Sequence, residues 1–278
     1  MSMNILYGAS PDDVKNFDTE RLRKEFLIND LFVPDKISFT YTHVDRMIIG
    51  GACPVREALE FGAGDDVGTQ YFFSAREMGI ANLGGAGKIS VDGTVFDLAN
   101  RDVLYIGRGA KKLLLTSNDE RSPANFYMNS VPAGADFPHR LIRKEQAKPI
   151  EMGEEKSASK RTLAMYIHPQ VAPSSLLLMG ITGLAQGSIW NTMPPHLHQR
   201  RMEAYCYFDM GKEDQVVHLM GRPDQTRHLM VGNKSAVLSP AWSIHMGAGT
   251  GPYAFVWGMT GENQAYTDVD PIAIADLR

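Results

Sequence analysis

Short runs in which apolar and polar residues alternate fill most of the chain from Leu31 onward. Side chains of a β-strand point to opposite faces in turn, so this period of two predicts strands. The runs follow one another closely, with Gly and Asn-Asp turns between them, which favours antiparallel barrels over alternating β–α units. Asp92-Gly93, between two alternating flanks, is the strongest hairpin signal. We expect strands at 37–41, 46–49, 68–73, 78–83, 89–96, 103–106, 112–116 and 124–129, and then at 162–167, 176–182, 203–208, 215–220, 226–231, 236–238 and 253–259.

Helical patterns are confined to the two ends of the chain. Residues 11–28 fit one or two short helices, of which the first opens at Pro11 and the second presents Leu22 and Phe26 on one face. Residues 268–277 fit a short capped helix with a proline at its first helical position. We expect these helices to flank an otherwise all-β protein.

The two halves of the chain are weakly self-similar, with a period of about 130 residues. Glu77 precedes a strand and a pair of glycines, and Glu203 precedes a strand and Gly211. This repetition predicts two copies of one β-barrel. The polar, charge-mixed stretch between them reads as a connection, with a long surface loop in a single domain as the alternative. The expected organisation is a helical segment at 1–30, a barrel at 31–135, a linker at 136–160 and a second barrel at 161–278.

Composition is that of a soluble globular protein, with 44% hydrophobic and 22% charged residues. The net charge of −4 and the lack of a basic stripe argue against a nucleic-acid partner. No apolar run approaches the eighteen or so residues that cross a membrane, and no leader pattern opens the chain. Cys53 and Cys206 lie in apolar runs and are expected to be buried free thiols, as in a reducing compartment. These features predict a cytoplasmic protein.

The candidate chemistry lies in the second half, where His196 and His198 stand two residues apart. Alternate positions of a strand share a face, so both imidazoles point the same way. A polar turn followed by a second strand would bring Glu203 beside them, and His245 would add a fourth ligand. Three nitrogens and one oxygen suit Zn²⁺, with Fe²⁺, Mn²⁺ or Ni²⁺ not excluded. The alternative is that these are ordinary core or surface histidines.

The first half lacks an equivalent ligand set. Gln70 and Phe72 stand where a histidine pair before Glu77 would fall, and Lys112 stands at the counterpart of His245. We therefore expect the first barrel to have a structural role and the second to carry the chemistry.

The pattern H-x-H-x4-E with a downstream histidine resembles the metal motif of the cupins, which are double-stranded β-helix, jelly-roll-like barrels. The match departs from the general pattern at Trp190, where a glycine is usual, and at residues 240–245. These departures point to one subfamily, that of 5-dehydro-4-deoxy-D-glucuronate isomerase, also called 4-deoxy-L-threo-5-hexosulose-uronate ketol-isomerase. The segments that carry this resemblance are 31–33, 45–46, 84–87, 190–194, 200–203, 239–245 and 261–264, and it extends over nearly the whole chain.

The resemblance implies a zinc-dependent bicupin, usually a homohexamer, with metal ligands at His196, His198, Glu203 and His245. It also implies an aldose–ketose isomerase of pectin and uronate catabolism. Its substrate is a small-molecule keto-uronate, 5-dehydro-4-deoxy-D-glucuronate, and its product is 3-deoxy-D-glycero-2,5-hexodiulosonate. The reaction would proceed through an enediolate that a divalent metal stabilises.

Acid–base and substrate residues are less clearly marked by the sequence. Glu262 and His228 are candidates for proton transfer, although each also fits an ordinary surface or core role. The substrate carboxylate calls for an arginine, whose planar fork matches two oxygens. Arg161 and Arg227, both at strand starts, are the preferred candidates, and Tyr205 shares a face with Glu203 and could contact the substrate.

Three rival functions remain open at the level of sequence. The 5-deoxyglucuronate isomerase of inositol catabolism would use the same metal site on a different substrate. An iron(II) dioxygenase is a different enzyme class that cupin ligands also support, and a sugar-binding module would bind without turnover. Assays of turnover, oxygen consumption and binding separate them.

Overall fold

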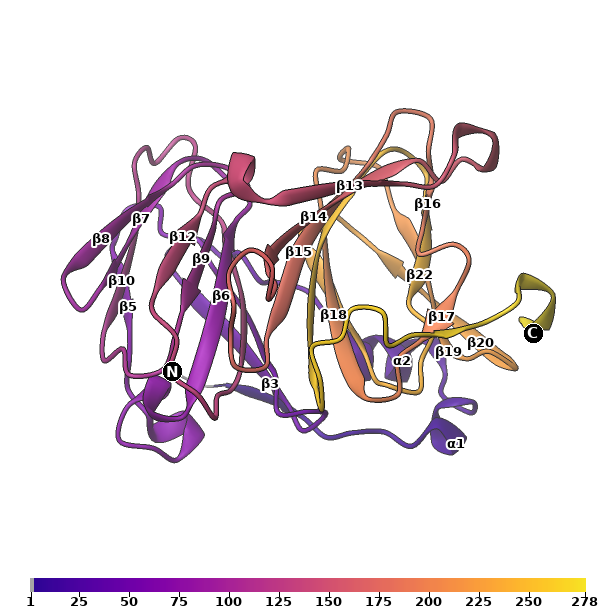
Figure 1. The fold of residues 1–278 in the computed structure, drawn as a ribbon, viewed down its shortest axis with the longest axis horizontal. Helices are drawn as coiled ribbons and strands as arrows, with labels where there is room; N and C mark the ends of the chain where they lie inside the picture. The colour runs from indigo at the N-terminus through magenta and orange to yellow at the C-terminus, as the bar shows by residue number, and fades with distance from the viewer. Residues whose placement is uncertain (1–2) are drawn as a thin grey trace. The chain divides into compact units, whose positions relative to one another are not determined.

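The computed structural model describes residues 3–278 (Figure 1) and divides them into two compact units. The first unit contains residues up to Leu6 together with Asp30–Lys148 and Met165–Met179. The second contains Tyr7–Asn29, Pro149–Ala164 and Gly180–Arg278. This division differs from the ranges expected from sequence: the helical segment near the N-terminus belongs to the second unit, and the expected linker 136–160 carries two strands.

The first unit contains a seven-stranded sheet in the order β1-β3-β4-β11-β6-β9-β12 and a four-stranded sheet in the order β5-β10-β7-β8. The large sheet is antiparallel except for the parallel pair β1 and β3. A core of aliphatic and aromatic side chains fills the unit. The strands are β1 (Asn4–Leu6), β3 (Ile37–Thr42), β4 (Ile48–Ala52), β5 (Leu59–Phe61), β6 (Arg76–Asn82), β7 (Gly87–Val91), β8 (Thr94–Leu98), β9 (Val103–Ile106), β10 (Leu113–Ser117), β11 (Phe126–Pro132) and β12 (Arg140–Ile142).

The second unit is built on the same plan, and its large sheet continues through the whole of β14 and β15, of which residues 165–167 and 178–179 belong to the first unit. Its sheets run β13-β14-β15-β23-β18-β21-β2 and β16-β22-β19-β20, and a two-stranded sheet joins β17 to β24. The strands are β2 (Leu27–Ile28), β13 (Lys148–Met152), β14 (Arg161–Ile167), β15 (Leu178–Leu184), β16 (Trp190–Asn191), β17 (His196–Leu197), β18 (Arg201–Phe208), β19 (Val216–Arg222), β20 (Gln225–Val231), β21 (Ser235–Ser239), β22 (Met246–Gly249), β23 (Ala254–Gly261) and β24 (Asp270–Pro271).

The strand orders of the two units correspond one for one. The run β3-β4-β11-β6-β9 matches β14-β15-β23-β18-β21, and β5-β10-β7-β8 matches β16-β22-β19-β20. The all-β class and the repetition of one barrel are therefore confirmed. Glu77 and Glu203 lie on corresponding strands, β6 and β18.

The two N-terminal helices form where the sequence predicted them. Helix α1 (Pro11–Val14) has Ser10 as its N-cap, and α2 (Thr19–Phe26) is capped by the side chain of Asp18. Leu22 and Phe26 are buried on one face of α2. None of the helices within residues 3–278 is long and apolar enough to span a bilayer.

The expected helix at 268–277 is wrong. Residues Asp270–Pro271 form β24 instead, paired with β17 so that His196 lies opposite Pro271. Only one 3-10 turn follows, at Ile274–Asp276. The backbone requirement of the strand pairing overrides the helix-start signal, because extended and helical conformations exclude one another.

Two further local predictions are confirmed. Asp92 and Gly93 both have positive φ, 48° and 90°, and connect β7 to β8 as a type I′ turn requires. Cys53 and Cys206 are buried and free.

Candidate metal centre

Three imidazoles and one carboxylate converge at one end of the second unit. Nε2 of His196 lies 3.1 Å from Nε2 of His245. Oε2 of Glu203 lies 3.1 Å from Nε2 of His198 and 3.2 Å from Nε2 of His245. The side chains of His196, His198 and His245 form a cluster that could hold a metal ion. Within residues 3–278 no other cluster of three or more His, Cys, Asp or Glu side chains has this property.

The local fold explains why these side chains meet. β17 ends after Leu197, and a turn closed by a hydrogen bond from Arg201 N–H to His198 C=O returns the chain into β18. On β18, alternate residues share a face, so Glu203 lies on the same side as Arg201 and Tyr205. His245 directly precedes β22, which lies in the four-stranded sheet of the same unit. The expected turn between His198 and Glu203 is thus present.

Hydrogen bonds on the far side of two rings fix their tautomers. Nδ1 of His198 donates to the carbonyl oxygen of Arg201 at 2.9 Å, and Nδ1 of His245 donates to the carbonyl oxygen of Ser243 at 3.3 Å. Because a carbonyl can only accept, each Nδ1 carries a proton, and each ring, when it is neutral, turns an Nε2 lone pair toward Glu203.

This arrangement of lone pairs fits a divalent metal ion. Two imidazole lone pairs and a carboxylate oxygen repel one another at 3.1–3.2 Å unless a proton or a metal ion lies between them. Four ligands at the bond lengths of zinc stand about 3.3 to 3.4 Å from one another in a tetrahedron. The three separations of 3.1–3.2 Å are close to that edge length, and the ligand atoms of the three histidines all lie within 4.8 Å of one another. The donor set of three nitrogens and one oxygen suits zinc and its neighbours in the periodic table.

Burial keeps two of the three imidazoles neutral. It lowers the pKa of His196 to about 4, with further lowering by His198 and two arginines, and it lowers the pKa of His245 well below the ordinary value. For His198, burial acts in the same direction, but the hydrogen bond and charge of Glu203 outweigh it and raise the pKa. Neutral imidazole is the form that binds metal.

A cavity of about 350 Å³ adjoins the cluster within the second unit. Its inner wall consists of alternate residues on neighbouring strands, which face inward from β14, β15, β23 and β18. The polar side chains other than the ligands are few, and most of the wall is apolar or aromatic. The lining includes Arg161, Leu163, Thr182, Thr192, Arg201, Tyr205, Phe255, Trp257, Met259 and Tyr266.

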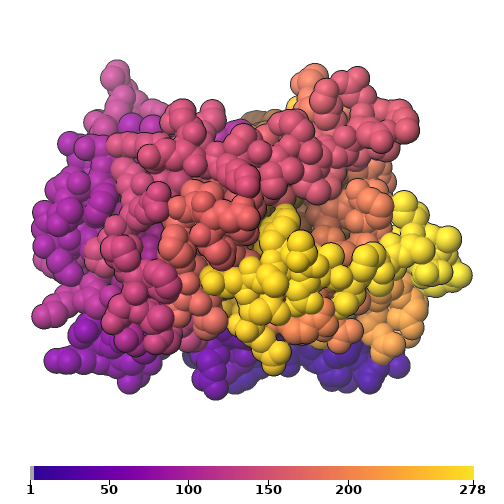
Figure 2. All heavy atoms as spheres, in the orientation of Figure 1, coloured from indigo at the N-terminus to yellow at the C-terminus, as the bar shows by residue number. Residues whose placement is uncertain are grey.

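Residues 262–272, which we call the strap, contribute Tyr266, Thr267 and Val269 to the cavity wall. Figure 2 shows the yellow C-terminal residues lying across the visible face of the second unit. The chain can pass here because Gly261 has no side chain: a Cβ would lie 2.1 Å from the carbonyl oxygen of Arg200.

Two arginines that follow His198 hold the strap. Arg200 forms ion pairs with Asp268 at 2.6 Å and Asp270 at 3.1 Å. The fully buried Arg201 donates to Asn263 and to the carbonyl oxygens of Ala265 and Asp268. Hydrogen bonding to Arg200 lowers the pKa of Asp268 to about 2. The segment that carries the histidines and the segment that covers the cavity are therefore linked.

The structure places the residues expected from sequence in two groups. Arg161 and Tyr205 line the cavity, and the Tyr205 hydroxyl lies 3.0 Å from Thr192 Oγ1. Arg227, His228 and Glu262 are not part of its lining.

Each residue of the second group has another environment. The guanidinium of Arg227 donates to the carbonyl oxygens of Val14, Lys15 and Phe17 and so holds the N-terminal helices. His228 is an exposed residue on β20, and Glu262 is exposed on the strap, where its backbone N–H bonds to Arg200.

Sequence reasoning did not single out Thr182, Trp257 or Tyr266 as cavity residues. The signal for Trp257 is its place in the alternation Phe255, Trp257, Met259 on β23, which pairs in register with β18 so that Trp257 lies opposite Tyr205. The contribution of Tyr266 depends on the course of the strap, which no periodic pattern marks.

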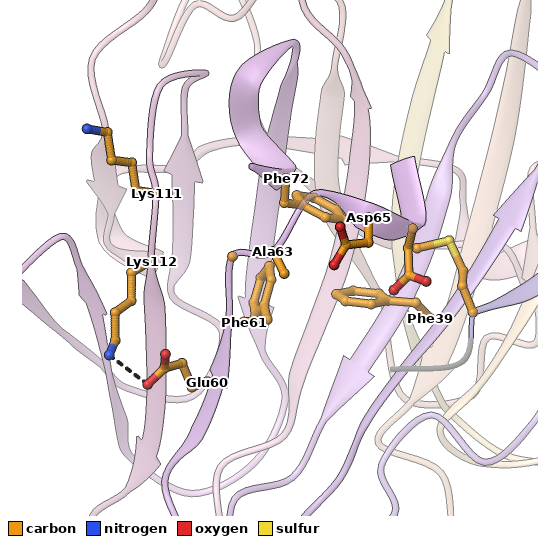
Figure 3. A pocket seen from close by; sticks show the side chains of 11 residues that line it. Phe39, Glu60, Phe61, Ala63, Asp65, Phe72, Lys111 and Lys112 are labelled. Atoms are coloured by element: carbon orange, nitrogen blue, oxygen red, sulfur yellow. Dashed lines mark ion pairs between the residues drawn. The ribbon is translucent and has the colours of Figure 1, made fainter. Parts of the chain in front are cut away.

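A second cavity, of about 460 Å³, lies within the first unit (Figure 3). Phe39, Phe61 and Phe72 pack against one another on its wall, with ring centroids 5.4–5.7 Å apart. The side chains of Glu60 and Lys112 form an ion pair that is more than half exposed. The charged groups at this second cavity are thus solvated, whereas His198, Glu203 and His245 beside the first cavity are buried.

Comparison with known proteins agrees with this geometry. The 4-deoxy-L-threo-5-hexosulose-uronate ketol-isomerase of Lachnoclostridium phytofermentans is 49% identical over 276 residues, which cover 99% of this chain and all of the relative. The protein of the same name from Yersinia pestis (strain Pestoides F) is 48% identical over 278 residues, with the same coverage.

Solved structures support the fold. An IolB-like protein from Salmonella typhimurium superposes with a TM-score of 0.68 at 13% identity, over 81% of this chain and 87% of the other. Oxalate decarboxylase from Lactobacillus farciminis gives a TM-score of 0.57 at 10% identity, over 82% and 79%. The model of the KduI/IolB family matches residues 32–273. With nearly full-length relatives at almost half identity, the chain belongs to the KduI/IolB family.

Proposed function

We propose that the protein is an aldose–ketose isomerase that converts 5-dehydro-4-deoxy-D-glucuronate to 3-deoxy-D-glycero-2,5-hexodiulosonate. The observation that carries this proposal is the convergence of His196, His198, Glu203 and His245 beside a cavity, in a chain whose full-length relatives are named ketol-isomerases. The reaction moves a carbonyl from carbon 1 to carbon 2. It requires a proton to leave carbon 2 and a proton to be added to carbon 1.

The same four residues would hold a divalent ion, which we propose to be Zn²⁺. Bound there, the ion supplies Lewis-acid stabilisation of the negative charge that develops on the oxygens of carbons 1 and 2. The proposal is supported by the lone-pair geometry described above, which suits a cation, and by the neutral state of His196 and His245.

Arg161 would bind the carboxylate of the substrate. It lines the cavity and is 8% exposed, and its guanidinium makes one hydrogen bond, from Nη1 to the carbonyl oxygen of Ser159. No carboxylate of residues 3–278 forms an ion pair with it. A buried cation without a counter-ion is costly, and an anionic ligand that fits its fork would remove that cost.

Tyr205 would act as a hydrogen-bond donor to the reacting end of the substrate. It is two residues from Glu203 on the same face of β18 and lines the cavity. Burial raises the pKa of Tyr205 well above its ordinary value, so the phenol keeps its proton at neutral pH. A protonated phenol can donate to an oxygen on which negative charge develops.

The finer biological setting belongs to the same proposal. A role in pectin and uronate breakdown and a homohexameric assembly are implied by the resemblance of the sequence to its family, and a cytoplasmic location is predicted from composition and the two free cysteines. The rival substrate is 5-deoxyglucuronate, because its isomerase would use the same metal site.

The proposal is tested by incubating the purified, zinc-loaded protein with each of the two sugars in turn, under nitrogen and in air. We expect oxygen-independent formation of the 2,5-diketo acid from the 4-deoxy keto-uronate, with turnover of 5-deoxyglucuronate at least about a hundredfold less efficient. Oxygen consumption would instead indicate a dioxygenase. A preference for 5-deoxyglucuronate would indicate the isomerase of inositol catabolism. Binding without turnover would indicate a sugar-binding module.

A further inference from the structure

Three buried polar atoms of cavity-lining residues have no hydrogen-bond partner within residues 3–278. One is Nε of Arg201, whose other guanidinium nitrogens hold the strap. The other two are Oγ1 of Thr182 and Nε1 of Trp257, which are the sole polar atoms of side chains that are 1% and 2% exposed. A buried donor or acceptor left unpaired destabilises a protein, so such atoms are rare in native structures and call for an explanation.

Their position on the sheet brings them to the same wall as Arg161. Arg161, Thr182 and Trp257 come from β14, β15 and β23, which are consecutive in the seven-stranded sheet. None of the three belongs to the set of four residues that would hold the metal. The residues of this wall therefore carry a guanidinium, a hydroxyl and an indole N–H, of which the hydroxyl oxygen and the indole nitrogen are covered in the ligand-free protein.

The register of β23 sets the distance of this group from the metal ligands. Trp257 lies directly opposite Tyr205, and Met259 lies opposite Glu203. Trp257 is thus a diagonal neighbour of Glu203, and such neighbours stand about 7–8 Å apart in an antiparallel pair. An extended six-carbon chain spans a similar length, roughly 6 Å from its first to its last carbon. A six-carbon sugar whose carbons 1 and 2 lie beside Glu203 would therefore reach this wall with carbons 5 and 6.

We infer that Thr182 and Trp257 form, together with Arg161, a second polar subsite that recognises the α-keto carboxylate end of the substrate. The substrate class rests on the proposed function, because a 5-hexosulose-uronate carries a ketone at carbon 5 beside the carboxylate at carbon 6. Arg161 binds the carboxylate, and the indole N–H donates to the ketone oxygen. The Thr182 hydroxyl donates to either oxygen.

The chemistry of the donors explains the choice of ligand. A guanidinium and an indole N–H only donate hydrogen bonds, and a carboxylate and a ketone only accept them. A 5-hydroxy uronate would bring a hydroxyl hydrogen to the same place, where Thr182 alone could accept it. The subsite therefore favours 5-keto uronates over uronates with a hydroxyl at carbon 5.

The test uses a pair of threonines on neighbouring strands. Thr182→Val replaces an unpaired buried hydroxyl with a methyl group of the same shape. Thr162→Val makes the identical change on β14, where Thr162 Oγ1 is hydrogen-bonded to Glu151 at 2.6 Å and Thr162 is not part of the cavity wall. Trp257→Phe removes the indole N–H and keeps an aromatic ring, and Thr182→Ser restores the hydroxyl.

Two measurements are made on each variant of the zinc-loaded protein. The first is the KM for the keto-uronate, and the second is calorimetric affinity for 2-oxoadipate and for 2-hydroxyadipate, which carry the two alternative chain ends without being turned over. Melting temperature is recorded without ligand.

We expect Thr182→Val and Trp257→Phe to raise KM and to weaken 2-oxoadipate binding by roughly tenfold each, the effect of one hydrogen bond to a strong acceptor. Thr182→Val should melt no lower than the wild type, because it removes an unpaired polar group. Thr182→Ser should stay within about twofold of the wild type. Thr162→Val should leave KM and affinity unchanged, although it removes a satisfied hydrogen bond.

Different results would refute the two proposals separately. If the wild type binds 2-oxoadipate more tightly than 2-hydroxyadipate but does not isomerise the keto-uronate, the proposed function fails and the subsite stands. If the wild type fails to bind 2-oxoadipate, or if Thr182→Val and Trp257→Phe bind it as the wild type does, the subsite is refuted whatever the activity.

Discussion

Nε2 of His198 lies 3.1 Å from Oε2 of Glu203, while Nδ1 of the same ring donates to the carbonyl oxygen of Arg201. The hydrogen bond at Nδ1 thereby fixes the orientation of the imidazole ring, so that Nε2 faces the Glu203 carboxylate. In the metal-free protein this position attracts a proton, since Glu203 raises the pKa of His198 against the effect of burial. A metal ion and a proton therefore compete for the same nitrogen.

That competition predicts the pH dependence of metal binding. Below its raised pKa, His198 must lose a proton before it can bind a metal, whereas His196, with a pKa of about 4, and His245 are already neutral. Zinc affinity should fall by about tenfold for each pH unit below the His198 pKa, corresponding to one released proton. Competition with a chromophoric chelator between pH 6 and pH 8 measures the slope. A slope of three protons would show that all the imidazoles are protonated without metal.

Glu77 in the first unit should matter for stability and not for turnover. Its buried carboxylate accepts hydrogen bonds from the backbone N–H groups of Ser175, Leu176 and Leu177 and from the Tyr105 hydroxyl, at 2.6–2.8 Å. Glu77→Gln turns an amide N–H₂ toward these donors, which should lower the free energy of unfolding by roughly 2–4 kcal/mol. Chemical denaturation measures this loss.

Activity per folded molecule should change less than about twofold in Glu77→Gln. The reason is that Glu77, unlike Glu203, is saturated by partners that tie down the chain at residues 175–177. A loss of turnover as large as that expected from removing His245 would contradict the proposal that the first unit has a structural role and the second unit carries the chemistry.

The ion pairs between Arg200 and the strap should control access to the cavity. Asp268→Asn weakens two hydrogen bonds from Arg200 and removes a charge near the buried Arg201, whereas Asp270→Asn weakens a single contact at 3.1 Å. We expect faster hydrogen exchange at residues 263–269 and a several-fold higher KM in Asp268→Asn, with an unchanged zinc content. Equal behaviour of the two variants would indicate that the strap is held by its backbone contacts.

Arg161 should contribute to substrate binding without supporting the fold. Arg161→Met removes a cation that is 8% exposed and has no ion pair within residues 3–278, so stability should be retained or improved. KM for the keto-uronate should rise roughly 10- to 100-fold, the usual effect of losing a charge-assisted hydrogen bond. Arg161→Lys keeps the positive charge, so its KM should lie between the KM of the wild type and that of Arg161→Met. A KM of Arg161→Met equal to that of the wild type would show that another residue binds the substrate carboxylate.

The fold was predictable from sequence because alternation and turn chemistry are local signals. The Asp92-Gly93 hairpin illustrates this point: both residues adopt the positive φ that the turn requires. The helix expected at 268–277 failed because the strand pairing of Pro271 with His196 depends on residues far away in the sequence.

The candidate site was predictable in part for the same reason. His196, His198 and Glu203 lie close together in the chain. The spacing of the two histidines indicated their common direction, and the polar run between His198 and Glu203 indicated the turn that brings Glu203 beside them. Trp257 and Tyr266 reach the cavity through strand register and through the course of the strap, which sequence periodicity does not encode. Sequence alone also could not place Arg227, because an arginine at the start of a strand can equally bind the carbonyl groups of a helix end, as Arg227 does at Val14 and Lys15.

The central claim, a metal-dependent isomerase centre, is tested most directly by metal content measured together with turnover. Elemental analysis of the purified protein should find about one divalent ion per chain. Turnover of the keto-uronate should disappear on chelation and return with Zn²⁺, and His245→Ala should lack both metal and activity while keeping its β-sheet circular dichroism. Full activity of the metal-free protein, or of His245→Ala, would contradict the account.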